Sequence, residues 1–168
     1  MLVDSGRHLQ RRKPESISTF MRERLRRYEL IAEATYYLLR ASWKLRLPFD
    51  RSARHLLRPL LQENSFRDET RAALDVRGAL AAVGRNLPHQ WTCLEKAMAA
   101  HGMLRKRHIA STLVLSVAPS EGGTVKAHAW LEAGGVVVTG RREKKAFVPI
   151  YSFSNAVAHP HGDIAPCS

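Results

Sequence analysis

The chain has 168 residues, which is enough for one domain with a hydrophobic core and too few for two full domains. Hydrophobic residues make up 45% and charged residues 25%, which excludes a disordered acidic chain. No apolar run approaches the roughly 20 residues that cross a bilayer, so the sequence predicts a soluble protein without a membrane span.

The net charge of +12 is unevenly distributed. Residues 1–58 hold 14 basic and six acidic residues. The arginines at 22–27 are mixed with the acidic residues Glu23 and Glu29. A basic surface attracts phosphate, so a nucleic-acid binder is one hypothesis. The chain lacks zinc-finger spacing, an aromatic ribonucleoprotein motif and a GxxG loop. We therefore favour a solvated face or a docking surface for an acidic partner.

The N-terminal end is basic but lacks the apolar segment of a secretory signal. Residues 1–15 are predicted to be a flexible basic arm that ends near Pro14. Cys93 and Cys167 allow one disulfide at most, and a reducing compartment disfavours it. We expect a cytoplasmic protein with free thiols.

Three helices are predicted in the first half of the chain. The first runs from Ile17 to about Leu47, where Pro48 ends it, and a short one lies between Asp50 and Leu61. The next covers 68–85. In the first helix, apolar residues recur at steps of three or four and predict one apolar stripe; they are Ile17, Phe20, Met21, Leu25, Tyr28, Ile31, Leu38 and Leu39.

A fourth helix from Cys93 to about Lys106 follows Thr92, a good N-cap residue. The periodicity then falls to two, which predicts strands at 112–117, 125–133, 136–139 and 147–153. The fold class is therefore α+β, with a helical N-terminal half packed on a C-terminal antiparallel sheet. We expect a single domain over 16–155, helical over 16–86 and with the Cys93 helix and the sheet over 87–155, before a tail at 156–168.

Cys93 and His128 could form a nucleophile and its base. A thiol in the first turn of a helix meets the positive end of the helix dipole, which favours the thiolate. His128 lies in the predicted strand 125–133, 35 residues downstream of Cys93. A buried free cysteine and a satisfied core histidine are the alternatives. A cysteine that opens a helix and a histidine on a following strand together match the thiol–imidazole arrangement of papain-like chemistry.

Three segments resemble one known family: Trp91-Thr-Cys-Leu, the helix end Met103-Leu-Arg-Lys-Arg-His-Ile-Ala-Ser, and Ala127-His-Ala-Trp-Leu-Glu. They are similar to the leader peptidases of lasso-peptide maturation, the microcin-processing family, a bacterial branch of the transglutaminase-like cysteine-protease superfamily. The likeness covers roughly 25–151 and includes Glu33-Ala and Leu47-Pro-Phe. It implies a transglutaminase-like or papain-like core, with Cys93 as nucleophile and His128 as general acid and base.

The resemblance also implies substrate and partners. Members of the family remove the leader of a ribosomally made precursor peptide before an ATP-dependent cyclase closes the macrolactam ring. Because little chain precedes Ile17, we expect the stand-alone form, which works with a separate leader-recognition protein. The alternative function is a non-catalytic scaffold that presents precursor peptide to the cyclase.

The third member of the family's triad does not carry over. The family's acidic residue follows the histidine by about a dozen positions, where this chain has Gly140. Glu132 shares a strand face with Trp130 and His128 but lies four residues from His128, about 13 Å along an unbent strand. We expect Glu132 and Trp130 to lie around the site without orienting the histidine directly. The other candidate orienters are Thr139, Glu143 and Asn155.

An oxyanion hole needs hydrogen-bond donors beside the thiol. The backbone N–H of Cys93 is the natural donor, and Gln90 and Trp91 are candidates for a second donor and for water exclusion. His101, His108, His159 and His161 are expected at the surface, without metal-ligand spacing, and there is no phosphate-binding glycine loop. The sequence therefore predicts no metal and no cofactor.

Overall fold

The computed structural model describes residues 17–46, 60, 66–120, 123–141 and 146–156. Its elements are α1 (Ile17–Leu45), α3 (Phe66–Asn86), α4 (Cys93–Lys106), β1 (Thr112–Pro119), β2 (Val125–Ala133), β3 (Val136–Thr139) and β4 (Val148–Ser154). All seven were predicted, with ends that differ by up to two residues. The predicted arm, most of the short helix at 50–61, Glu143 and most of the tail lie outside the described residues.

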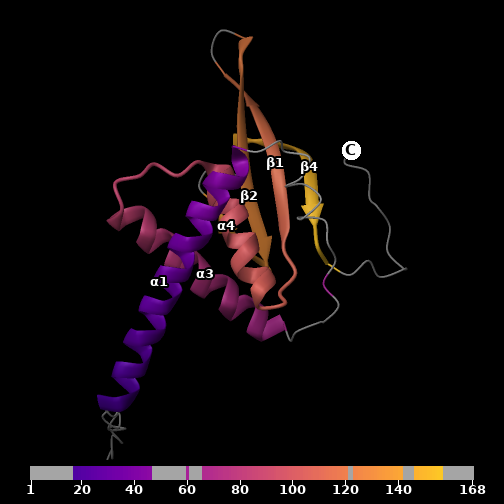
Figure 1. Ribbon diagram of the computed structural model, residues 1–168. Helices are drawn as coiled ribbons and strands as arrows, with labels where there is room; N and C mark the ends of the chain where they lie inside the picture. Colours follow the sequence, from indigo (N-terminus) through magenta and orange to yellow (C-terminus); the bar gives the residue numbers. More distant parts are fainter. Residues whose placement is uncertain (1–16, 47–59, 61–65, 121–122, 142–145, 157–168) are drawn as a thin grey trace, which may run out of the picture.

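The four strands form one antiparallel sheet in the order β3-β2-β1-β4, and the helices lie together beside it (Figure 1). β1 and β2 pair without interruption from Thr112 opposite Glu132 to Pro119 opposite Val125. Gly134 and Gly135 close the β2–β3 hairpin with positive φ angles of 53° and 74°, which glycine adopts without steric cost. The predicted α+β architecture is confirmed.

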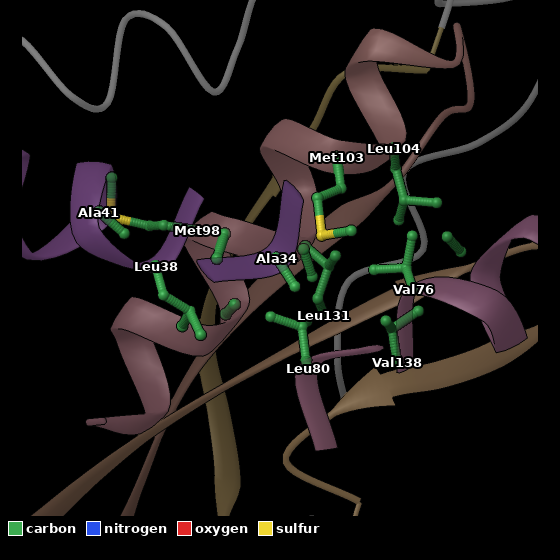
Figure 2. Close-up of a cluster of buried hydrophobic side chains, with 14 of the residues drawn as sticks. Ala34, Leu38, Ala41, Val76, Leu80, Met98, Met103, Leu104, Leu131 and Val138 are labelled. Carbon is green, nitrogen blue, oxygen red and sulfur yellow. The ribbon is translucent and has the colours of Figure 1, made fainter. Parts of the chain in front are cut away.

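The core lies between the helices and one face of the sheet (Figure 2). Along β2, Ala129, Leu131 and Ala133 belong to this cluster, since alternate residues of a strand face the same side. The helices contribute fully buried side chains such as Leu38 and Met103. The opposite face of β2 carries His128, Trp130 and Glu132, and Trp130 is buried outside that cluster.

The single apolar stripe predicted on α1 is wrong, because the structure separates its residues onto two faces. Ile31 and Leu38 pack against the core, whereas Met21, Leu25, Tyr28 and Leu39 are more than half exposed. A spacing of three or four residues is satisfied by apolar residues on either side of a helix. Only the packing of α3 and α4 decides which side is covered.

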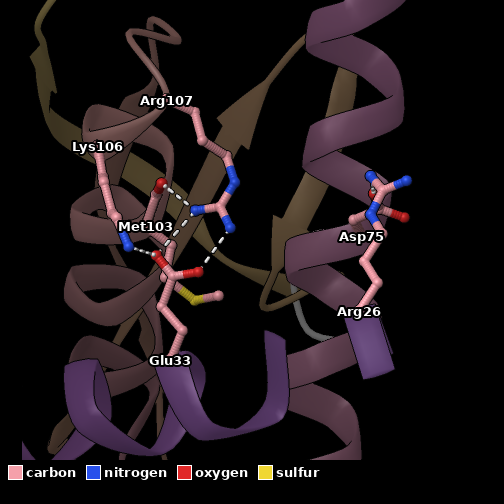
Figure 3. A network of polar contacts seen from close by, with 6 residues as sticks. All are labelled: Arg26, Glu33, Asp75, Met103, Lys106 and Arg107. Carbon is pink, nitrogen blue, oxygen red and sulfur yellow. Dashed lines mark hydrogen bonds and ion pairs between the residues drawn. The ribbon is translucent and has the colours of Figure 1, made fainter. Parts of the chain in front are cut away.

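Polar contacts fix α1 against both other helices (Figure 3). Glu33 on α1 receives two hydrogen bonds from Arg107, at 2.6 and 3.0 Å, and lies 3.3 Å from the amine of Lys106. Burial raises the pKa of Glu33, but Arg107 and Lys106 outweigh it and hold the pKa below its ordinary value. Arg26 pairs with Asp75 on α3 at 2.8 Å.

Candidate active site

Cys93 occupies the first turn of α4, directly after the N-cap. Thr92 has an extended conformation, with φ −68° and ψ 162°, and its hydroxyl accepts a hydrogen bond from the Glu95 N–H. The Glu95 carboxylate in turn accepts from the Thr92 N–H at 2.6 Å, which completes a capping box. The predicted N-cap is confirmed. The Cys93 side chain is half-buried at the border of the core cluster.

Glu95 is a buried carboxylate that ties this turn to α1. Besides Thr92, it accepts a hydrogen bond from the Ser42 hydroxyl at 2.5 Å. Burial raises the pKa of Glu95, but the hydrogen bonds from Ser42 and Thr92 stabilise its charged form and leave the pKa below 4.5. The carboxylate therefore stays ionised at neutral pH and keeps Cys93 in a fixed first turn.

The capping box leaves two backbone donors of this turn unused. The first N–H groups of a helix have no partner within the helix. Thr92 and Glu95 satisfy each other, so among the described residues the N–H groups of Cys93 and Leu94 are left without acceptors. Two adjacent amides beside a thiol can together stabilise a negatively charged oxygen.

His128 stands on β2 and is held by strand pairing and packing. It pairs with Ser116 on β1, whose buried hydroxyl donates to the His128 carbonyl oxygen at 3.1 Å. The imidazole lies 5.0 Å from the ring of Phe147 and 6.3 Å from that of Trp130, measured between ring centroids. Two aromatic rings thus limit where the imidazole can turn.

Gly140 lies directly against the His128 ring. A Cβ added to it would come within 2.9 Å of the His128 Nε2, 2.7 Å of the Trp130 Cβ and 2.9 Å of the Ala129 carbonyl oxygen. Its φ is +72°, a conformation that side chains rarely adopt. The position where the resemblance implies a carboxylate is therefore next to Nε2, but this backbone has no space for one.

Cys93 and His128 lie on two different elements, α4 and β2. α4 lies alongside the sheet (Figure 1) with Cys93 in its first turn, whereas His128 is opposite Ser116 on β1. No hydrogen bond joins the two side chains in the described part of the chain. On β2, His128 lies on the same face as Trp130 and Glu132, which is the face opposite to the core cluster.

Two of the residues expected as candidates for orienting His128 form hydrogen bonds with other groups. The Thr139 hydroxyl accepts a hydrogen bond from the Leu131 N–H at 3.2 Å. Asn155 is fully buried, and its Oδ1 accepts from the Ser111 N–H at 2.7 Å, beyond the other end of β1. Neither side chain orients His128. The third candidate, Glu143, is outside the described residues.

The remaining predicted residues have different surroundings. Trp130 donates its indole N–H to Glu132 at 2.8 Å, so these two side chains bind each other on the His128 face. Trp91 is buried in the core cluster, while Gln90 is exposed in the segment before α4. His101 was expected at the surface but is buried, with its Nδ1 2.9 Å from the Ser111 hydroxyl, because α4 is enclosed on several sides.

Sequence reasoning overlooked four residues that contact Cys93, His128 or the turn that carries Cys93. The Thr92-x-x-Glu95 spacing of a capping box could have identified Glu95. Ser42, Ser116 and Phe147 carry no such pattern, because each meets the site only through tertiary packing or strand register.

Within the described ranges no three His, Cys, Asp or Glu side chains are grouped closely enough to hold a metal ion. None of the described helices is both long and apolar enough to span a bilayer.

Comparison with known families gives one match. The profile described as Transglutaminase-like superfamily matches residues 36–152, a segment that contains the last third of α1, all of α3 and α4, and nearly the whole sheet. Neither the curated proteins nor the solved structures gave a match to this chain.

Proposed function

This chain belongs to the transglutaminase-like superfamily, which includes cysteine proteases, and from that premise we propose that it is a cysteine peptidase with Cys93 as its nucleophile. The observation that carries the proposal is the first turn of α4. It combines a thiol with two N–H groups that have no acceptor among the described residues, in a turn fixed by a buried, ionised carboxylate. Attack on a carbonyl needs both a nucleophile and donors for the oxyanion.

The reaction proceeds in two stages. The Cys93 thiol gives its proton to the His128 imidazole and its sulfur attacks the scissile carbonyl carbon, while the N–H groups of Cys93 and Leu94 bind the oxyanion. The imidazolium then protonates the departing amine as the C–N bond breaks, which leaves a thioester. His128 next removes a proton from water, the hydroxide attacks the thioester, and the carboxylic acid product leaves as the Cys93 thiol is restored.

The proposed mechanism uses two residues, Cys93 and His128. Gly140 leaves Nε2 facing backbone, and among the described residues Phe147 and Trp130 pack against the imidazole. A thiolate–imidazolium pair needs no third group for proton transfer. The mechanism requires the His128 ring to reach the Cys93 thiol.

We propose that the substrate is the leader peptide of a ribosomally made lasso-peptide precursor. Support comes from the segments around Cys93 and His128 that resemble the leader peptidases of that pathway. The same resemblance supports two partners, a separate leader-recognition protein and an ATP-dependent cyclase, and a bacterial cytoplasmic location.

Cleavage of a precursor by purified protein tests this function. With the recognition protein present, Cys93→Ala should abolish cleavage between leader and core, whereas Cys167→Ala should cleave at the wild-type rate. Mass spectrometry of the products measures both. Full cleavage by Cys93→Ala would contradict the proposal.

Gly140 favours a second candidate, a non-catalytic scaffold that presents precursor peptide to the cyclase. A scaffold has no need of a reactive thiol. Iodoacetamide should alkylate Cys93 faster than a free thiol at neutral pH if the site is catalytic, and His128→Ala should remove that advantage. An alkylation rate equal to that of free thiol in both proteins would favour the scaffold.

A further inference from the structure

The outer face of α1 carries a second apolar stripe that no described element covers. It consists of seven residues, which are Met21, Leu25, Tyr28, Ala32, Tyr36, Leu39 and Trp43. At 3.6 residues per turn they occupy roughly 80° of the helix circumference, and the centre of the stripe is roughly 150° from the core-facing side. The six large side chains are 53–71% exposed, and Trp43 is the most exposed.

This stripe extends over almost the whole helix. From Met21 to Trp43 it spans about 33 Å at 1.5 Å per residue. The N-terminal part of α1 projects away from the rest of the protein (Figure 1), and residues 19–29 are all exposed. A helical segment that buries so little receives little stabilisation from its own domain.

The spacing within the stripe indicates what kind of surface would cover it. Its members follow one another at steps of four, three, four, four, three and four residues. Steps of three and four, which here repeat every 11 residues, form the narrow seam through which one helix packs against another. The observed seam therefore fits one partner helix.

The charges beside the stripe indicate the chemistry of that helix. α1 contains six basic and three acidic residues. Arg22, Arg24 and Arg40 flank the stripe and form no ion pair with any described acidic residue, whereas Arg26 is already paired with Asp75 (Figure 3). A second copy of this basic helix would place like charges opposite one another. An acidic helix would pair with these three arginines, of which Arg24 and Arg40 lie over the rings of Phe20 and Tyr37.

We propose that the outer face of α1 binds an acidic amphipathic α-helix of another protein. The apolar side chains of that helix would pack along Met21–Trp43 and its carboxylates would pair with Arg22, Arg24 and Arg40. The interaction is separate from the peptidase chemistry, because Cys93 lies on α4 and takes no part in the stripe.

Binding of a synthetic peptide tests the proposal. The probe is a fluorescent 28-residue peptide with leucine at heptad positions a and d, glutamate at e and g, and alanine elsewhere. Its like charges weaken its self-association. By fluorescence anisotropy, the wild-type protein should bind it at least tenfold more tightly than a shuffled peptide of the same composition, and at least tenfold more tightly than the version with lysine in place of glutamate.

Substitutions on the stripe should remove this binding. Leu39→Asp and Trp43→Asp should each weaken binding at least tenfold, while Ile150→Asp, which changes an equally exposed residue on β4, should not. Circular dichroism checks that each variant is folded, and Leu39→Ser offers a milder change should Leu39→Asp unfold. Cys93→Ala should bind the peptide as the wild type does. Helix binding on α1 can therefore be tested even if the peptidase proposal fails.

Three outcomes would overturn the proposal. Binding that is equal for the shuffled peptide or unaffected by Leu39→Asp would show that the stripe does not recognise a helix. A protein dimer in sedimentation equilibrium that Leu39→Asp dissociates would identify a second copy as the occupant. Cosedimentation with vesicles of phosphatidylcholine and phosphatidylserine, lost in Trp43→Asp, would identify a membrane instead.

Discussion

The two proposed catalytic residues are held by different kinds of interaction. Cys93 lies in a turn fixed by polar groups, because Thr92, Glu95 and Ser42 exchange hydrogen bonds around a buried charge. Among the described residues, His128 packs between aromatic rings and the backbone of Gly140. Polar contacts around the nucleophile leave two amides without acceptors in the described part of the chain, whereas aromatic packing limits the rotation of the base. We therefore expect changes near Cys93 to depend on pH and changes near His128 to depend on side-chain size.

The largest effect is expected for His128→Ala, because general acid–base catalysis by a side chain contributes about 10²- to 10⁴-fold. The rate of leader cleavage should fall by that factor, while the midpoint of thermal unfolding changes little. Leu131→Ala on the other face of β2 is the matched control. It should cost about 2–5 kcal/mol in the free energy of unfolding, because Leu131 is fully buried in the core. An unchanged cleavage rate in His128→Ala would remove His128 from the mechanism.

Glu95→Gln should lower the free energy of unfolding by about 3 kcal/mol at pH 7, because the amide is neutral and keeps only one oxygen, so either the Thr92 N–H or the Ser42 hydroxyl loses its acceptor and faces an NH2 group. The pKa of Glu95 is lowered in the folded protein, so its stabilising effect is complete above its ordinary value of 4.5 and is lost as the pH falls below that value. Urea unfolding at pH 7, 4 and 3 measures this dependence. A difference between wild type and variant that stays constant over these pH values would contradict the polar fixing of the Cys93 turn.

Gly140→Ala should cost about 2 kcal/mol and slow cleavage, because the added Cβ meets the His128 ring and the Ala129 carbonyl oxygen. Gly123→Ala separates the cost of the backbone conformation from the cost of the contact with His128. Gly123 has a similar φ of +76° but nothing within 4 Å of an added Cβ, so it should show only the smaller backbone cost and normal cleavage. Chemical denaturation and cleavage rates measure both variants. Equal losses in the two would mean that contact with His128 is unimportant.

Ser42→Ala should have the smallest effect, about 1 kcal/mol, because Glu95 keeps its two contacts with Thr92 after the loss of one donor. Double-mutant analysis with Glu95→Gln isolates the coupling between α1 and the Cys93 turn. If the two losses are simply additive, Ser42 and Glu95 act independently and α1 does not help to fix the nucleophile.

Local sequence patterns predicted the site unevenly. The N-cap at Thr92 follows from local chemistry, and Glu95 lies three residues further on in the same turn. The burial of His101 and the engagement of Asn155 far from His128 were missed, because both depend on how α4 and β4 meet Ser111. The sequence showed that Gly140 stands where the family it resembles has an acidic residue. Only the fold shows that the Gly140 backbone fills the space beside the His128 Nε2.

The sequence by itself determined the order and type of the elements, the position of Cys93 at a helix start and that of His128 inside a strand. These features depend on contacts between residues close in the chain, where periodicity, caps and turns act. Only the tertiary structure decided which face of each element is covered. It divided the apolar residues of α1 into a buried and an exposed stripe, and it placed a glycine backbone against the histidine. Periodicity fixes the angle between side chains around a helix, but the neighbours that cover them come from distant parts of the chain.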